Sequence, residues 1–93
     1  MADKNTPFVK VVLDKERTLK LDLNGLEAFE EVTGKSLADL GDGVDTKTMR
    51  HLIWAALLHE DPEITPHDVG SLIHIGNIGR VKAALEELMT KNA

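Results

Sequence analysis

The stretch Thr46-Lys-Thr-Met-Arg-His-Leu-Ile-Trp-Ala-Ala-Leu-Leu-His-Glu-Asp-Pro62 decides the fold. It predicts one helix, which Asp45 or Thr46 caps at the N-terminus and which Pro62 stops. One apolar stripe recurs at helical spacing and consists of Met49, Leu52, Ile53, Ala56 and Leu57. The other side is also largely apolar, since it carries His51, Trp54, Ala55 and Leu58. Such a helix has to be covered on both sides, by its own domain or by a partner.

Two segments before this helix predict an antiparallel β-hairpin. Phe8 to Leu13 is rich in β-branched residues, and a charged turn, Asp14 to Arg17, separates it from Thr18 to Leu23. The second segment alternates, so that one face carries Leu19, Leu21 and Leu23. Because a lone hairpin is marginal in water, this face has to pack on helices, while the hairpin edges can pair with another chain.

Capping signals predict the remaining helices. Asn24 and Glu27 form a capping box for a helix that Gly34 ends, with Leu26, Phe29 and Val32 facing inward. Ser36 and Asp39 predict a short helical turn over 37–40. Thr65 and Pro66 begin a further helix with a buried stripe of Val69, Leu72 and Ile73, and Asn77 caps the last one. The sequence predicts an α+β, mostly helical fold: an N-terminal β-hairpin followed by about four helices in one small domain.

Length and charge limit the possible functions. The 93 residues fit one domain, which we place at 8–93, after a polar tail over 1–7 that we expect to be disordered. The net charge of −5 and the scattered Lys and Arg residues argue against a nucleic-acid partner. The N-terminus has no apolar run of the signal-peptide type, so we expect a soluble, cytoplasmic protein without a membrane partner.

The metal-site motifs that come closest all fail. The chain has no cysteine, which excludes disulfides, zinc–thiolate sites and a Cys nucleophile. His59-Glu60 begins like HExxH, but position 63 is Glu and Pro62 breaks the helix. His67 and His74 lie two turns apart without a third ligand, and the acidic residues around 39–45 have glycines where a calcium loop needs oxygen ligands.

No catalytic arrangement is apparent either. Ser36 and Ser71 lie outside any GxSxG motif, and nothing assembles a nucleophile, a base and an oxyanion donor. We therefore predict no enzyme activity, no catalytic residue, no metal and no cofactor. Residues 66–75 imitate the second helix of a helix-turn-helix, but their exposed side offers His, Asp and Ser in place of phosphate-binding Arg or Lys.

Two segments resemble a known family. Leu-Lys-Leu-Asp-Leu-Asn-Gly-Leu-Glu-Ala-Phe-Glu-Glu-Val-Thr-Gly-Lys-Ser-Leu (19–37) and Leu-Ile-Trp-Ala-Ala-Leu-Leu-His-Glu-Asp-Pro-Glu-Ile-Thr (52–65) are similar to the tail assembly chaperones of long-tailed (siphovirus-type) bacteriophages and prophages. The tryptophan run with its His-Glu-Asp-Pro ending is the most specific part. The resemblance covers roughly residues 18–75 and leaves the last helix outside it.

The resemblance implies a non-enzymatic function in virion morphogenesis. Members of the family coat the tape measure protein and help to recruit tail tube protein during tail assembly. They act in the host bacterial cytoplasm and do not remain in the mature virion. The resemblance also implies self-association, and it implies that a longer, frameshifted form often accompanies the short one.

The doubly apolar helix and the hairpin edge suggest where a partner binds. Our hypothesis is a protein interface that combines two sets of residues: Phe8, Val9 and Val11 from the hairpin edge, and His51, Trp54 and Leu58 from the central helix. The competing interpretation places Trp54 in a monomer core, under the leucine face of the hairpin. For function, the alternative is a small acidic regulatory module, antitoxin- or anti-repressor-like, that binds a basic protein through its acidic helix faces.

Overall fold

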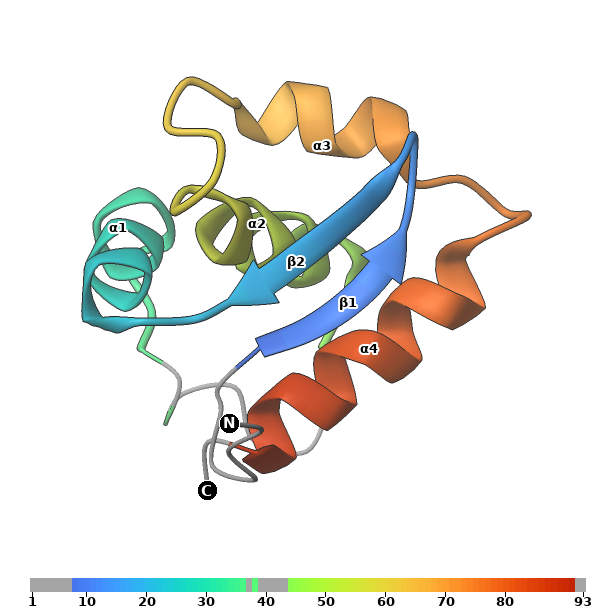
Figure 1. Cartoon of the computed structure of the whole chain (residues 1–93). Coiled ribbons are helices and arrows are strands. Elements are labelled where there is room, and N and C mark those ends of the chain that lie inside the picture. The colour runs from blue at the N-terminus through green and yellow to red at the C-terminus, as the bar shows by residue number, and fades with distance from the viewer. Residues whose placement is uncertain (1–7, 37, 39–43, 92–93) are drawn as a thin grey trace.

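A β-hairpin and four helices make up the described part of the chain in a computed structural model, which describes residues 8–36, 38 and 44–91 (Figure 1). The hairpin comes first, and the helices follow it. The elements are β1 (Phe8–Val12), β2 (Glu16–Lys20), α1 (Leu23–Thr33), α2 (Thr46–Leu57), α3 (Pro66–Leu72) and α4 (Ile78–Lys91). The predicted α+β fold, mostly helical with an N-terminal hairpin, is confirmed. The expected disorder of 1–7 and the turn over 37–40 concern stretches that lie largely or wholly outside the described residues.

Both strands of the hairpin are one residue shorter than predicted, and the turn between them is tighter. β1 and β2 are antiparallel, with Val9 opposite Leu19 and Val11 opposite Arg17. The second strand begins at Glu16 and not at Thr18, because Arg17 reaches back to Asp14 with its Nε 3.0 Å from the carboxylate and so closes the turn early. Buried Val9, Val11 and Leu19 make the inner face of the hairpin.

The cap of the first helix lies two residues earlier than predicted. Asp22, not Asn24, is the N-cap, and its carboxylate accepts a hydrogen bond of 2.9 Å from the Gly25 N–H. Leu23 therefore leaves the hairpin face and becomes the first helical residue, 80% exposed. Gly34 ends the helix as predicted, in the left-handed conformation with φ 74°.

The inward face of α1 is also narrower than predicted. Phe29 is fully buried and Leu26 packs against the core, but Val32 is 51% exposed. Val32 lies in the last turn of the helix.

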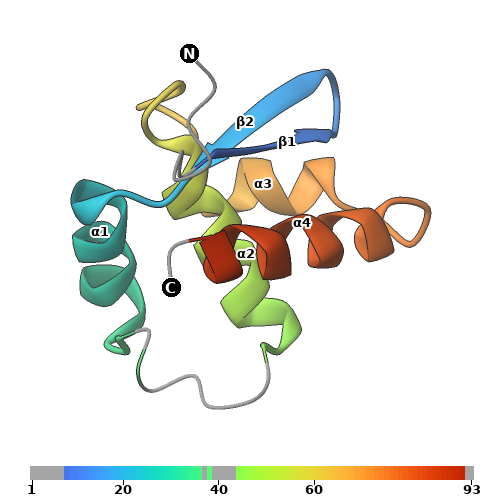
Figure 2. The same cartoon turned by 60° about the horizontal axis from the view of Figure 1, so that its bottom comes forward.

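The second helix, α2, is the centre of the domain. Its N-cap is Asp45, whose carboxylate accepts from the Thr48 N–H at 2.8 Å. Helices α1 and α3 and strand β2 all pack against it, while α4 packs against β1 (Figures 1 and 2). The residues of α2 in the buried core are Met49, Leu52, Ile53, Ala55, Ala56 and Leu57.

Helices α3 and α4 follow in sequence. Thr65 is the N-cap and Pro66 lies in the first turn, as predicted. Asp68 also completes a reciprocal capping box with Thr65, and Val69 is fully buried. Asn77 stands directly before α4, where its carbonyl accepts from the Val81 N–H at 3.0 Å, but its side chain bonds backward into the loop and does not cap the helix. It accepts from the His74 N–H at 2.8 Å and donates to the Leu72 carbonyl at 2.9 Å. Within the described residues, no helix has the length and apolarity needed to cross a membrane.

Candidate partner-binding surface

Trp54 lies on the side of α2 that faces the α2–α3 linker. Its ring is partly buried against the core, and its indole Nε1 donates a hydrogen bond of 2.9 Å to the Ile64 carbonyl. The His51 ring stands edge-on to it, with centroids 6.4 Å apart. The indole is thus held in one orientation while part of it stays accessible. The placement combines features of a core residue and of an interface residue.

Leu58 and His51 extend the same side of α2. Leu58 is half-buried and packs against the core at the C-terminal end of the helix. The Nδ1 of His51 lies 2.9 Å from the Lys47 carbonyl one turn earlier. His51 also lines a hollow of about 120 Å³ between α1 and α2, together with Val32 and Thr48.

The three hairpin residues of the predicted interface differ from one another. Phe8 is 41% exposed, and the ammonium of Lys20 lies 6.0 Å from its ring centroid. Val9 and Val11 are only 6% and 4% exposed. Their side chains point into the core, so the predicted hairpin edge offers a partner its backbone and not these two side chains. With Leu19 directed inward, its partner Val9 must point inward too.

The predicted surface is divided between two parts of the molecule. β1 packs against α4, whereas Trp54 bonds to the linker between α2 and α3. Figure 1 places that linker above α2 and places α4 below the hairpin. The structure thus brings His51, Trp54 and Leu58 together on one helix and puts Phe8 elsewhere.

The His-Glu-Asp-Pro ending of the tryptophan run fastens the hairpin to α2. The His59 Nε2 lies 2.8 Å from the Thr18 carbonyl oxygen, and the Thr18 N–H donates to the Glu60 carboxylate at 3.4 Å. Both backbone groups of Thr18 are therefore satisfied by side chains. This edge of the hairpin is closed, which explains why His59 and Glu60 stand side by side although neither belongs to a zinc motif.

Arg17 is a buried residue that the sequence analysis missed. Its guanidinium holds Asp14 through two bonds of 3.0 and 3.1 Å and lies 3.7 Å from the Asp61 carboxylate and 3.9 Å from that of Glu60. The hydrogen bond from Arg17 lowers the pKa of Asp14, and the same contact raises the pKa of Arg17. The strand alternation carried the signal, since Arg17 has the same parity as inward-facing Leu19.

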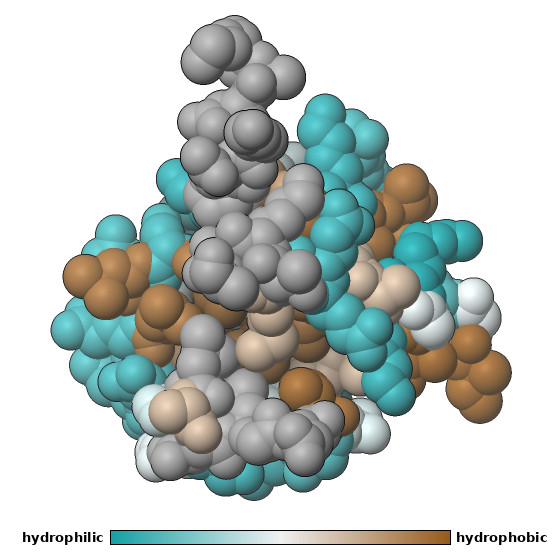
Figure 3. All heavy atoms as spheres, turned by 90° about the horizontal axis from the view of Figure 1, so that it is seen from below, coloured by the Kyte–Doolittle hydropathy of each residue, from teal (hydrophilic) through white to brown (hydrophobic). Residues whose placement is uncertain are grey.

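The exposed apolar side chains lie apart from one another. Figure 3 shows hydrophobic side chains at opposite sides of one face, over α1 and over the α3–α4 loop. The exposed large apolar residues of the described chain include Leu23 and Val32 in α1 and Ile75 in that loop, where the side chain is 95% exposed. These patches favour several modest contacts over one large apolar interface.

The described residues offer no metal site, and the comparisons with known proteins add nothing. Within residues 8–36, 38 and 44–91, no three His, Asp or Glu side chains come together in a way that could hold a metal ion. No model of a protein family, no curated protein and no solved structure matches this chain.

Proposed function

We propose that this chain is a phage tail assembly chaperone that coats the tape measure protein and helps to recruit tail tube protein in the host cytoplasm. The support begins with the two segments 19–37 and 52–65, which resemble that family. In the fold these segments are packed together, because α1 packs against α2. The most specific part of the resemblance is the tryptophan run with its His-Glu-Asp-Pro ending, and His59 and Glu60 of this ending bond to Thr18 of the hairpin.

The surface of α2 around Trp54 is the observation that carries the proposal. A tryptophan that is held in place by a hydrogen bond, but keeps part of its ring accessible, is suited to anchor a partner because little entropy is lost on binding. A long helical client offers the same kind of apolar face at many positions. Many copies of a modest contact then give strong overall binding, without a cofactor or a nucleotide.

Co-expression with the tape measure protein of the same phage or prophage tests this proposal. A tagged tape measure should remain soluble and retain the chain through purification. We expect Trp54→Ala to reduce the retained amount strongly, provided circular dichroism shows a folded protein. The matched control is Lys82→Ala, which also removes a long side chain but from an exposed position on α4. Equal retention of both variants, or no retention of the wild type, would refute the proposal.

The exposed acidic residues of α1 favour a second candidate, a regulatory module that binds a basic protein. Glu27, Glu30 and Glu31 are all exposed. The same co-purification, repeated over a salt series, distinguishes the two candidates. Attraction between exposed charges is screened by salt, whereas apolar packing around Trp54 is not.

A further inference from the structure

The two edges of the hairpin differ in how their backbone is used. At the outer edge of β2, Thr18 directs its N–H and its carbonyl to Glu60 and His59. Thr18 stands opposite Lys10 in the register. Opposite residues of an antiparallel pair either bond to each other or both point their backbone groups outward. The N–H and carbonyl of Lys10 therefore point away from β2, at the outer edge of β1.

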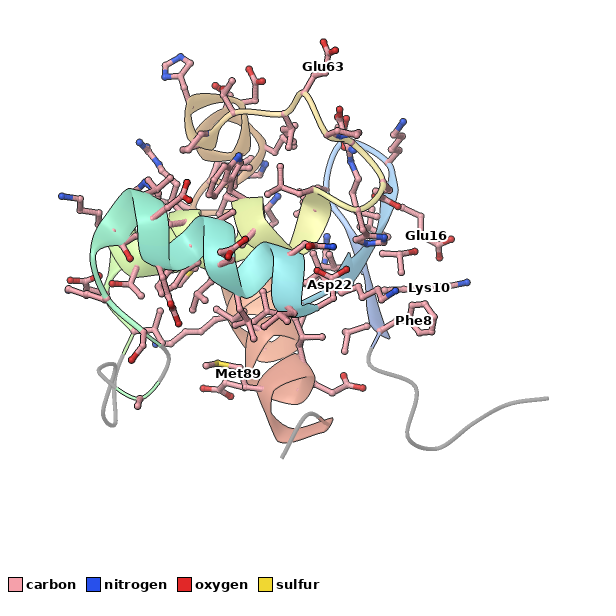
Figure 4. All side chains as sticks on the ribbon, turned by 90° about the vertical axis from the view of Figure 1, so that its left-hand side faces the viewer. Phe8, Lys10, Glu16, Asp22, Glu63 and Met89 are labelled. Carbon is pink, nitrogen blue, oxygen red and sulfur yellow. The ribbon has the colours of Figure 1, made fainter. Side chains whose placement is uncertain are left out.

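This edge of β1 is open. Among the described residues, no group bonds the outward N–H or carbonyl of Lys10. Two residues further on, the Val12 carbonyl accepts from the Arg80 Nη1 at 3.3 Å. Figure 4 shows the side chains of Phe8 and Lys10 pointing away from the helices, so they do not cover the edge. A free stretch of strand edge is the usual template for an added strand.

A groove of about 330 Å³ runs beside this edge, between β1 and α4. Its α4 side has small residues in the middle, Ala83 and Ala84, with Arg80 toward one end and Glu87 toward the other. Figures 1 and 2 show α4 running in the opposite direction to β1. The Arg80 end thus lies at Val12, where the two are bonded, and the Glu87 end lies toward the start of β1.

The position of α4 decides which occupant fits. Two copies joined through their β1 strands would bring two α4 helices beneath strands about 4.8 Å apart. Packed helices need about 8–10 Å between their axes. The groove therefore accepts an extended segment that carries no helix beneath it, and it does not suit a second copy of this chain.

We propose that the edge of β1 and the α4 groove bind an extended segment of another protein as an added antiparallel strand. The segment has an acidic, an apolar and a basic side chain at alternate positions, in that order. In this direction the acid meets Arg80, the apolar side chain rests on the alanines, and the base meets Glu87. The spacing fits, since the ends of such a triad lie about 13 Å apart on a strand. Arg80 and Glu87 lie about 10 Å apart along the helix.

Nuclear magnetic resonance titration with a synthetic peptide tests this proposal. The probe is the capped peptide Thr-Glu-Thr-Ile-Thr-Lys-Thr, and its control is the charge-reversed Thr-Lys-Thr-Ile-Thr-Glu-Thr. We expect the probe to shift the amide signals of Lys10, Ala83 and Ala84. The control should bind about tenfold more weakly, because two ion pairs at the groove ends become repulsions.

Three variants sharpen the test. Lys10→Pro removes an N–H that the hairpin does not use, so we expect it to abolish probe binding and leave the fold intact. Arg80→Glu with Glu87→Lys should reverse the preference between the two peptides. Lys82→Glu changes the charge as Arg80→Glu does, but Lys82 is exposed and does not line the groove, so peptide preference should not change.

Several outcomes would overturn the proposal. They are equal binding of the two peptides to the wild type, absence of shifts along β1, and unchanged preference in the double variant. Concentration-dependent shifts of the Lys10 amide without peptide would assign the edge to a second copy instead. The inference goes beyond the proposed function and does not depend on it, because the peptide experiment contains no tape measure protein and leaves the Trp54 side of α2 untouched.

Discussion

The indole of Trp54 in α2 is tied to the backbone of Ile64 by a hydrogen bond of 2.9 Å, ten residues along the chain. This bond joins the central helix to the linker that leads into α3. Ile64 itself is buried, with 7% exposure. The linker is therefore held both by this hydrogen bond and by the packing of the Ile64 side chain. The indole nitrogen of Trp54 thus stabilises the fold, while the accessible part of the ring remains available to a partner.

Trp54→Phe and Trp54→Ala separate these two contributions. Phenylalanine keeps an aromatic ring but cannot donate, so we expect a loss of about 1 kcal/mol in the free energy of unfolding. Alanine also removes the packed ring, and we expect a loss of about 3 kcal/mol. Urea denaturation followed by circular dichroism measures both. A Trp54→Phe protein as stable as the wild type would contradict a stabilising role for the bond to Ile64.

Gly25 sets the distance between α1 and α2. A Cβ at this position would lie 2.8 Å from the Ala55 carbonyl oxygen, which belongs to the backbone of α2 and cannot move aside easily. We therefore expect Gly25→Ala to destabilise the fold by about 1–3 kcal/mol.

The matched control for this substitution is Gly79→Ala. Gly79 lies in α4 with nothing within 4 Å of an added Cβ, so the change should stabilise the helix by about 0.5 kcal/mol. Thermal denaturation of both variants gives the comparison. Shifts of the same sign would show that the close approach to Ala55 does not limit the packing of the two helices.

Arg17 holds the hairpin turn and the end of α2 together, and lysine cannot replace it. The guanidinium of Arg17 donates to both carboxylate oxygens of Asp14 and also faces the carboxylates of Glu60 and Asp61. Lysine offers a single charged centre, so we expect Arg17→Lys to cost about 1 kcal/mol of unfolding free energy. Lys15→Arg is the control at an exposed position of the same turn. Equal stability of Arg17→Lys and the wild type would contradict this account.

The lowered pKa values of Asp14 and Asp45 lead us to expect that the fold loses stability in acid. The hydrogen bond from Arg17 lowers the pKa of Asp14 below its ordinary 3.8, and hydrogen bonds from Thr48 lower the pKa of Asp45. A carboxyl whose pKa is lower in the folded state stabilises the fold above its ordinary pKa. That stabilisation is lost as the pH falls through the folded-state value.

We therefore expect the urea midpoint to fall between about pH 5 and about pH 2.5. In Asp14→Asn the fall over this range should be smaller, because one of the two carboxyls no longer titrates. A wild-type midpoint that rises on acidification, or an equal fall in the variant, would contradict the role of Asp14.

The sequence predicted the fold where local signals and burial agreed. Asp45, Thr65 and Pro66 mark where helices begin through their local backbone chemistry, and Gly34 marks where a helix ends. The missed features depend on distant residues. Asp22 replaces Asn24 as the cap because the strand ends at Lys20, and Asn77 bonds backward because the α3–α4 loop needs its donors and acceptors.

The predicted interface shows the same division. The clustering of His51, Trp54 and Leu58 follows from helical spacing and could be predicted. The burial of Val9 and Val11 depends on which face of the hairpin meets α4, and the closed edge at Thr18 depends on His59 and Glu60, which follow α2. Both features depend on contacts between distant segments, which the local sequence pattern does not reveal.

The most direct test of the proposed function is the stoichiometry of the complex with the tape measure protein. Light scattering after size exclusion, on the co-expressed proteins, gives the mass of the complex. A coating chaperone predicts many copies of this chain on each tape measure, and more copies on a longer tape measure fragment. A single copy whatever the fragment length, or a tape measure that elutes alone, would contradict the account.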